Sequence, residues 1–186
     1  MSSPRRSVLA MAVLSMLSEE SMHAYRMQQL IKERHKDEVV NVAQRNSVYQ
    51  TIERLLRDGL IEVEATERAE NRPERTTYRL TAPGATTLTR WLREMVAEPA
   101  REFPEFPAAL AFLPSLDAGD ALGALRSRIA SLERQLAGLD AGLAESGAVL
   151  PRLFLVEDEY RRAVVAAELD YVRSLADDVA GGDLRW

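Results

Sequence analysis

Five side chains between residues 45 and 54 carry groups that can bind nucleic acid. Arginine can donate two hydrogen bonds to guanine O6 and N7, and the amide of Asn or Gln can bridge N6 and N7 of adenine. We therefore expect Arg45, Asn46 and Gln50 to contact base edges. Tyr49 and Arg54 are expected to contact phosphate oxygens. The alternative interpretation of such a polar stripe is an ordinary solvated helix face.

A second group of arginines lies in the polar stretch between residues 66 and 75. Arginines on a loop tip suit the phosphate backbone or a narrow minor groove. They alternate with glutamates, which would also suit a merely solvated loop. Arg5, just before the first apolar segment, could add one phosphate contact or simply be solvated. The candidate tip residues are Arg68, Arg72 and Arg75.

The elements that must position these side chains begin with a helix over residues 44–58. Gly59 predicts the end of this helix, because glycine takes positive φ without a steric clash. Apolar residues then alternate with polar ones in 60–65 and again in 76–81, which predicts a hairpin with a charged tip. The apolar face of the helix, opposite the candidate contacts, consists of Val48, Ile52, Leu55 and Leu56.

Three more helices complete the first half. Residues 7–17 are apolar nearly all round, which predicts a buried helix. Ser21 is the expected N-cap of a helix over 22–35, and Thr81 is the expected N-cap of a fourth helix. Three helices, a hairpin and a helix make a winged helix-turn-helix, whose third helix enters the major groove. The inner stripe of the second helix is predicted to consist of Tyr25, Met27, Leu30 and Ile31.

The second half predicts two long helices. Large aliphatic residues recur every three or four positions in residues 117–145, a heptad seam typical of helix pairing. The seam residues expected to hold two copies together are Leu122, Leu125, Ile129, Leu132, Leu136 and Leu139. Residues 152–179 form the other helix, and its predicted apolar stripe consists of Leu153, Val156, Tyr160, Val164, Ala167, Tyr171 and Leu175.

We therefore expect a mainly α protein in three parts. Residues 1–97 form an N-terminal winged helix-turn-helix domain, with three helices and a β-hairpin wing. Residues 98–115 are a connector, because 98–107 contains three prolines and predicts irregular backbone. Residues 116–186 form a C-terminal helical dimerisation domain of two long helices.

The charge distribution and the apolar runs indicate which partners and which compartment to expect. The chain has 186 residues, no cysteine and a net charge of −5. Residues 1–95 carry 15 Lys and Arg against 13 Asp and Glu, whereas 96–186 carry 9 against 16, so an anionic partner would meet the first half. No apolar run reaches the roughly 20 residues of a membrane span, and no cleavage site follows the N-terminus, so we expect a cytoplasmic protein.

Nothing in the sequence predicts an enzyme. There is no glycine-rich phosphate loop, no Ser-His-Asp set and no carboxylate pair at useful spacing. His23 and His35 are the only histidines and stand out of line on one helix, so a metal site is not expected; His23 fits packing or capping at the helix start. We expect no catalytic residue, cofactor or metal.

Four stretches of the first half follow one another as a set of motifs. They are VLAMAVLSML (8–17), SMHAYRMQQLI (21–31), NSVYQTIERLLRDGLIE (46–62) and YRLTAPG (78–84). In this order and spacing they resemble the PadR family of bacterial transcription regulators. The departures are Ala24, where the family usually has glycine, Gln50, where proline is common, and Ile52, where leucine is.

The resemblance implies a homodimeric repressor in the bacterial cytoplasm, associated with the nucleoid. Many such proteins release DNA on binding a small aromatic or cationic compound, or respond to envelope stress.

Aromatic residues near the end of the first half suggest an effector site. Trp91, Phe103 and Phe106 could sandwich a flat ligand or a cation. The alternative is that they pack the joint between domains. The resemblance to PadR proteins supports the ligand hypothesis, because that family uses an aromatic residue of the fourth helix at a pocket beside the dimer interface.

Three functions fit these observations. The first is a homodimeric repressor that binds an inverted-repeat operator in double-stranded DNA and leaves it when a small molecule binds. The second keeps DNA binding without a ligand. The third is a winged-helix module that binds another protein, which the acidic pI of about 5.2 favours.

Overall fold

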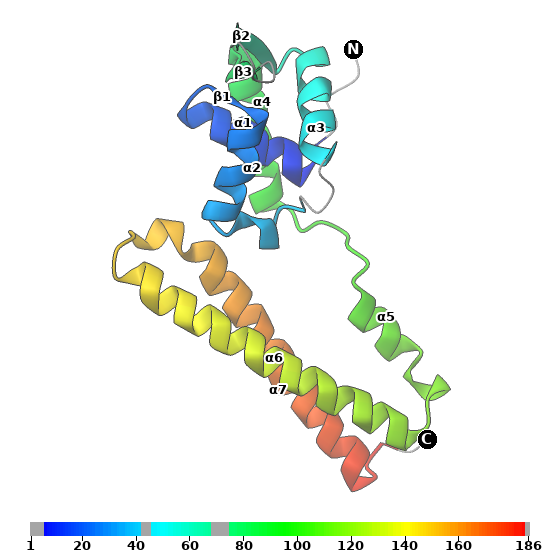
Figure 1. Cartoon of the computed structure of the whole chain (residues 1–186). Helices are drawn as coiled ribbons and strands as arrows, with labels where there is room; N and C mark the ends of the chain where they lie inside the picture. The colour runs from blue at the N-terminus through cyan, green and yellow to red at the C-terminus, as the bar shows by residue number, and fades with distance from the viewer. Residues whose placement is uncertain (1–5, 42–45, 68–74, 185–186) are drawn as a thin grey trace. The chain divides into compact units, whose positions relative to one another are not determined.

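The structure is a computed structural model that describes residues 6–41, 46–67 and 75–184. The chain divides into two compact units, Met1–Arg101 and Glu102–Trp186. Both are built mainly from helices (Figure 1), which confirms the predicted fold class. The division falls inside residues 98–115, the predicted connector. None of the described helices is both long and apolar enough to span a membrane.

The first unit has the predicted order of three helices, a hairpin and a fourth helix. Its apolar faces enclose a single core in which Leu14, Met27, Ile52 and Trp91 are almost completely buried. A 3₁₀ turn, Lys36–Glu38, follows the second helix. The elements are α1 (Val8–Glu19), α2 (Ala24–Glu33), α3 (Asn46–Arg57), β2 (Ile61–Glu67), β3 (Arg75–Leu80) and α4 (Ala82–Ala97).

The start of α2 differs from the prediction. Met22 and His23 form a short strand, β1, that pairs antiparallel with β3 and makes a three-stranded sheet in the order β1-β3-β2. The N-cap of α2 is therefore His23 and not Ser21, with the ring accepting a hydrogen bond from Arg26 N. A two-residue strand has no measurable period, so the sequence alone could not reveal it.

The junction between α3 and the wing is held by backbone contacts. Gly59 has φ of 69°, as its place after α3 predicts. Thr81 Oγ1 donates to Gly59 O at 2.8 Å and accepts from Gly84 N at 3.1 Å, so Thr81 caps α4 as expected. Thr81 N also donates to Leu60 O at 3.2 Å. We call this set of contacts the wing clasp, because it joins the two ends of the hairpin to the end of α3.

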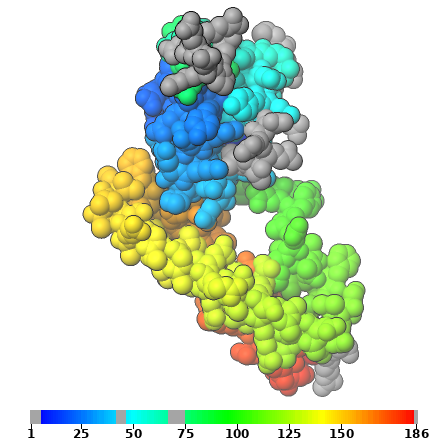
Figure 2. All heavy atoms as spheres, viewed as in Figure 1, coloured from blue at the N-terminus to red at the C-terminus, as the bar shows by residue number. Residues whose placement is uncertain are grey.

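The second unit is a helical hairpin with a short helix packed on it. Asp117 caps α6, and α6 and α7 run antiparallel along their lengths (Figures 1 and 2). The helix α5 begins inside the stretch predicted to be irregular, since a proline is tolerated in the first turn of a helix. The elements are α5 (Glu105–Ala111), α6 (Ala118–Gly147) and α7 (Val156–Gly181), with 3₁₀ turns Leu113–Ser115 and Arg152–Phe154.

The buried face of α7 is not the predicted one. Of the predicted stripe, Leu175 alone is buried. The exposed members are Leu153, Val156, Tyr160, Val164, Ala167 and Tyr171. The helix carries two apolar stripes, and periodicity cannot decide which one meets α6. Residues of the buried face are Val165, Leu169, Val172, Leu175, Ala176 and Val179. The exposed apolar stripe of α7, as we name it, consists of Val156, Tyr160, Val164 and Tyr171.

Candidate nucleic-acid interface

The face of α3 that the sequence singled out is partly open to solvent. Tyr49 and Gln50 are exposed on it, and Val48 and Ile52 face the core. Arg54 lies at the edge of this face and donates to Ser7 Oγ at 2.9 Å, which ties α3 to the N-cap of α1. The structure thus brings Tyr49 and Gln50 together and gives Arg54 a neighbour within the protein.

The other proposed contacts lie at the ends of elements or outside the described residues. Asn46 is the first residue of α3, and a recognition helix reads bases with its N-terminal residues. Arg75 begins β3, at the root of the wing tip. The proposed contacts that the structure does not describe are Arg5, Arg45, Arg68 and Arg72.

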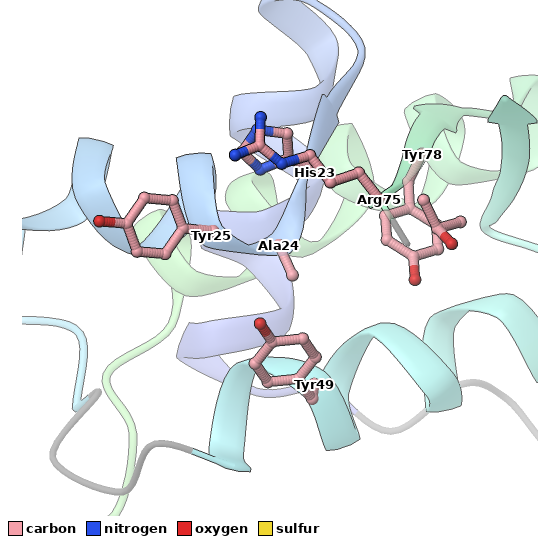
Figure 3. Close-up of a pocket in the computed structure, with 7 residues that line it drawn as sticks. His23, Ala24, Tyr25, Tyr49, Arg75 and Tyr78 are labelled. Carbon is pink, nitrogen blue, oxygen red and sulfur yellow. The ribbon is translucent and has the colours of Figure 1, made fainter. Parts of the chain in front are cut away.

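A cavity of about 210 Å³ opens beside this face, between the start of α2, α3 and β3 (Figure 3). Tyr49 points from α3 toward the start of α2, and Arg75 extends from β3 toward His23. We call this cavity the wing-root pocket. It is lined by His23, Ala24, Tyr25, Tyr49, Arg75, Thr76 and Tyr78.

The lining is rich in hydrogen-bond donors. Nδ1 of His23 accepts from Arg26 N at 3.0 Å, so the neutral ring carries its proton on Nε2. The His23 and Tyr25 rings stack with their centroids 6.3 Å apart. Burial raises the pKa of the Tyr78 hydroxyl; nearby Tyr49 and Glu53 act in the same direction, and a hydrogen bond with Thr76 acts against them. The Tyr78 hydroxyl therefore stays protonated at neutral pH.

Sequence reasoning proposed two of the pocket residues, Tyr49 and Arg75, and missed the rest. It assigned Tyr25 to the inner stripe of α2, but this side chain is 57% exposed. Ala24 takes the buried position instead. Alternation along residues 76–81 could have placed Tyr78 with Thr76 on one face of the strand. The pairing of β1 with β3, which brings His23 to the same place, leaves no such signal.

The aromatic residues suggested for an effector are divided between the two units. Trp91 is 1% exposed, in the core of the first unit. Phe106 packs against the α6–α7 core, and the guanidinium of Arg128 lies 3.5 Å above its ring centroid. Phe103 is 82% exposed. Within the first unit, the Trp91 ring is covered by protein and offers no open face for stacking.

The heptad seam of α6 packs against α7 of the same chain. Leu125 and Leu132 are buried there, and the other four seam residues are partly buried in the same cluster. Ion pairs flank the contact, with Arg173 of α7 2.7 Å from Glu133 of α6 and Arg162 paired with Asp140. Much of the surface that the sequence assigned to dimerisation is thus already covered within one chain.

Residues 13–90 match the sequence model of the transcriptional regulator PadR-like family. None of the curated proteins compared with the chain matches it. Bacillus subtilis PadR in complex with operator DNA is similar in structure, with 20% identity, a TM-score of 0.72, and 93% of this chain and 99% of that chain covered. The same protein in complex with p-coumaric acid has 18% identity and a TM-score of 0.75, with 94% of this chain and 99% of that chain covered. The Vibrio cholerae virulence activator AphA has 17% identity and a TM-score of 0.67, with 93% of this chain and 98% of that chain covered.

At these identities the structural likeness establishes the fold. The likeness to the family comes from the sequence match over residues 13–90, which includes α2, α3, the hairpin and part of α4. These are the elements that carry the exposed face of α3 and the wing-root pocket. Over residues 13–90 the chain is similar to the transcriptional regulator PadR-like family.

Proposed function

We propose that this protein is a homodimeric repressor that binds an inverted-repeat operator through α3 and the wing. The observation that carries the proposal is that Tyr49 and Gln50 are both exposed on α3, and that Tyr49 lines one pocket with Arg75 at the root of the wing. Amide and guanidinium groups at these places suit base edges and phosphates. The likeness to Bacillus subtilis PadR, whose structure contains operator DNA, supports the proposal.

A gel shift with the DNA upstream of the protein's own gene tests DNA binding. We expect a specific complex that survives an excess of unrelated duplex. With roughly eight phosphate contacts per dimer, the logarithm of the affinity should fall with the logarithm of salt concentration at a slope near −7. An absence of binding to this and to random duplexes at about 50 mM salt would rule out the proposal and favour the protein-interaction alternative.

The dimer is proposed to form through the second unit. The α6 seam is largely occupied by α7, so a second copy would meet the exposed apolar stripe of α7. The four large apolar side chains of this stripe lie on one side of α7, within roughly 90° around the helix axis. Such a stripe is unusual on a fully solvated surface. A dimer would place two α3 helices at half-sites roughly 34–36 Å apart, which requires an inverted repeat.

Release by a small aromatic or cationic compound completes the proposal. It is supported by the likeness to Bacillus subtilis PadR, whose structure contains p-coumaric acid. We would add p-coumaric acid, and separately tetraphenylphosphonium, to the gel shift and to a thermal melt. Loss of the complex together with a raised melting temperature supports an effector. If neither compound changes either measurement, these two ligands are excluded.

Gln50→Ala is expected to relax sequence preference at one base pair. Its amide is exposed on α3, and a bidentate contact to a base contributes about 1–3 kcal/mol of discrimination. Affinities for operators carrying every single-base change would measure this. Gln135→Ala, exposed on α6, is the matched control and should leave the profile unchanged. If Gln50→Ala also kept the parent profile, Gln50 would not be a reading residue.

A further inference from the structure

The described lining of the wing-root pocket carries a positive charge and hydrogen-bond donors. Among the lining residues that the structure describes, Arg75 is the sole formal cation and none is a carboxylate. Tyr49 and Tyr78 bring hydroxyl groups from α3 and β3. His23 brings an N–H group, because its other ring nitrogen is occupied by the cap of α2. A cavity in which three elements converge with donors suits an anion.

We propose that the wing-root pocket is an anion site that holds one backbone phosphate of the operator in each half-site. The inference rests on the proposed DNA binding and specifies one contact of that interface. A phosphate offers several acceptor oxygens, which a guanidinium can meet with two parallel hydrogen bonds. Hydroxyl groups from Tyr49 and Tyr78 can meet the others.

The start of α2 adds to the same site. Ala24 and Tyr25 are the first residues of this helix, where backbone N–H groups have no carbonyl partner within the helix. Such N–H groups and the helix dipole favour an anion. The cavity of about 210 Å³ is several times the share of volume of one water molecule, about 30 Å³. Glu53 of α3 does not line the pocket, but its negative charge helps to raise the pKa of Tyr78 and would repel a bound anion.

Arg75 differs from Arg79, which lies further along the same strand, in its described carboxylate partners. Arg79 of β3 pairs with Glu62 of β2 at 2.8 Å. Arg26 and Arg34 of the same unit also face glutamates, at 2.9 and 2.6 Å. Among the residues whose side chains the structure describes, Arg75 has no carboxylate partner. Arg79 therefore provides a matched control, because its removal takes one positive charge from β3 without touching the pocket.

The site would fix how α3 sits in the groove. Tyr49 lines the pocket, and Gln50 follows it on the exposed face of α3. A phosphate held against Tyr49 therefore sets the depth and register of Gln50 at the base edges. Contacts of this kind position a protein on the duplex and carry no sequence information of their own.

The test compares the parent, Arg75→Gln and Arg79→Gln on a set of operator duplexes. Each duplex carries one neutral methylphosphonate in place of one phosphate, moved stepwise along the backbone. In the parent, one position per half-site should weaken binding about tenfold. In Arg75→Gln this position should cost much less than in the parent, and all other positions should cost the same. Arg79→Gln should keep the parent profile.

Two further measurements sharpen the result. Arg75→Gln should make the salt slope shallower by about 0.9 for each lost phosphate contact, whereas Arg79→Gln should leave the slope unchanged. Tyr78→Phe keeps the ring and should lower the penalty at the same methylphosphonate position as Arg75→Gln.

The outcomes separate this inference from the proposed function. If the parent binds the operator and Arg75→Gln weakens every duplex by one common factor, the pocket holds no particular phosphate and the inference is wrong. If Arg79→Gln changes the profile as Arg75→Gln does, the effect is one of charge alone, and the inference is again wrong. If the parent binds no duplex, the proposed function fails with it.

Discussion

Val164→Glu is expected to yield a folded monomer that has lost most of its affinity for the operator. Val164 lies in the exposed apolar stripe of α7 and is 46% exposed, so a carboxylate there remains solvated in a single chain. In the proposed dimer it would be buried against a second copy without a partner, which is strongly unfavourable. Loss of the second half-site should lower operator affinity about a hundredfold or more. Sedimentation and a gel shift measure the two effects.

Leu132→Glu provides the contrast, because it acts inside one chain. Leu132 is 6% exposed in the contact between α6 and α7. An unpaired carboxylate at this place should cost about 3–5 kcal/mol of unfolding free energy and melt the second unit. Circular dichroism and urea unfolding would show it. A dimeric Val164→Glu would exclude the stripe as the interface, and a normally folded Leu132→Glu would contradict the packing of α6 on α7.

Gly84→Ala is expected to destabilise the first unit by about 3 kcal/mol. A Cβ at this position would stand 2.0 Å from the carbonyl oxygen of Leu60 and 2.8 Å from Cδ1 of Leu80. The first neighbour is backbone and belongs to the wing clasp, so either α4 or the end of α3 must move. Relief of this clash would break the hydrogen bond from Thr81 N to Leu60 O. The midpoint of urea unfolding measures the effect.

Gly123→Ala on α6 is the matched control for that substitution. A Cβ at Gly123 would meet nothing within 4 Å, and the residue lies inside a helix. Alanine there should raise the free energy of unfolding by up to about 1 kcal/mol, because it favours the helix more than glycine does. Gly84→Ala with the stability of the parent would show that α4 does not approach Leu60 this closely.

The sequence was most informative where a local rule and the tertiary contact agree. Four-and-three spacing up to Arg57, positive φ at Gly59 and alternation from Ile61 specify helix, stop and strand without reference to distant residues. Thr81 is another such case, since an N-cap is a local contact. The core side of α3 and the presence of the hairpin therefore followed from pattern alone, whereas β2 runs to Glu67 and β3 starts at Arg75, which extends both strands into the predicted tip.

Only part of the candidate site could be predicted from such local patterns. His23 reaches the wing-root pocket because β1 pairs with β3, residues more than fifty positions apart in the chain. Tyr25 and Ala24 are neighbours on α2, and the larger residue is the exposed one, against the rule that apolar bulk is buried. On α7 two apolar stripes compete, and only the packing against α6 shows which one is buried.

The wing clasp has a consequence for how this protein can diversify. The chain enters and leaves the hairpin at one place, where Thr81 bonds to both Gly59 and Leu60. Residues added between β2 and β3 would therefore not disturb the core, and doubling a flexible loop costs only about 0.6 kcal/mol. In the proposed complex, insertion or deletion between β2 and β3 would thus change the length of the wing without moving Gln50 on α3.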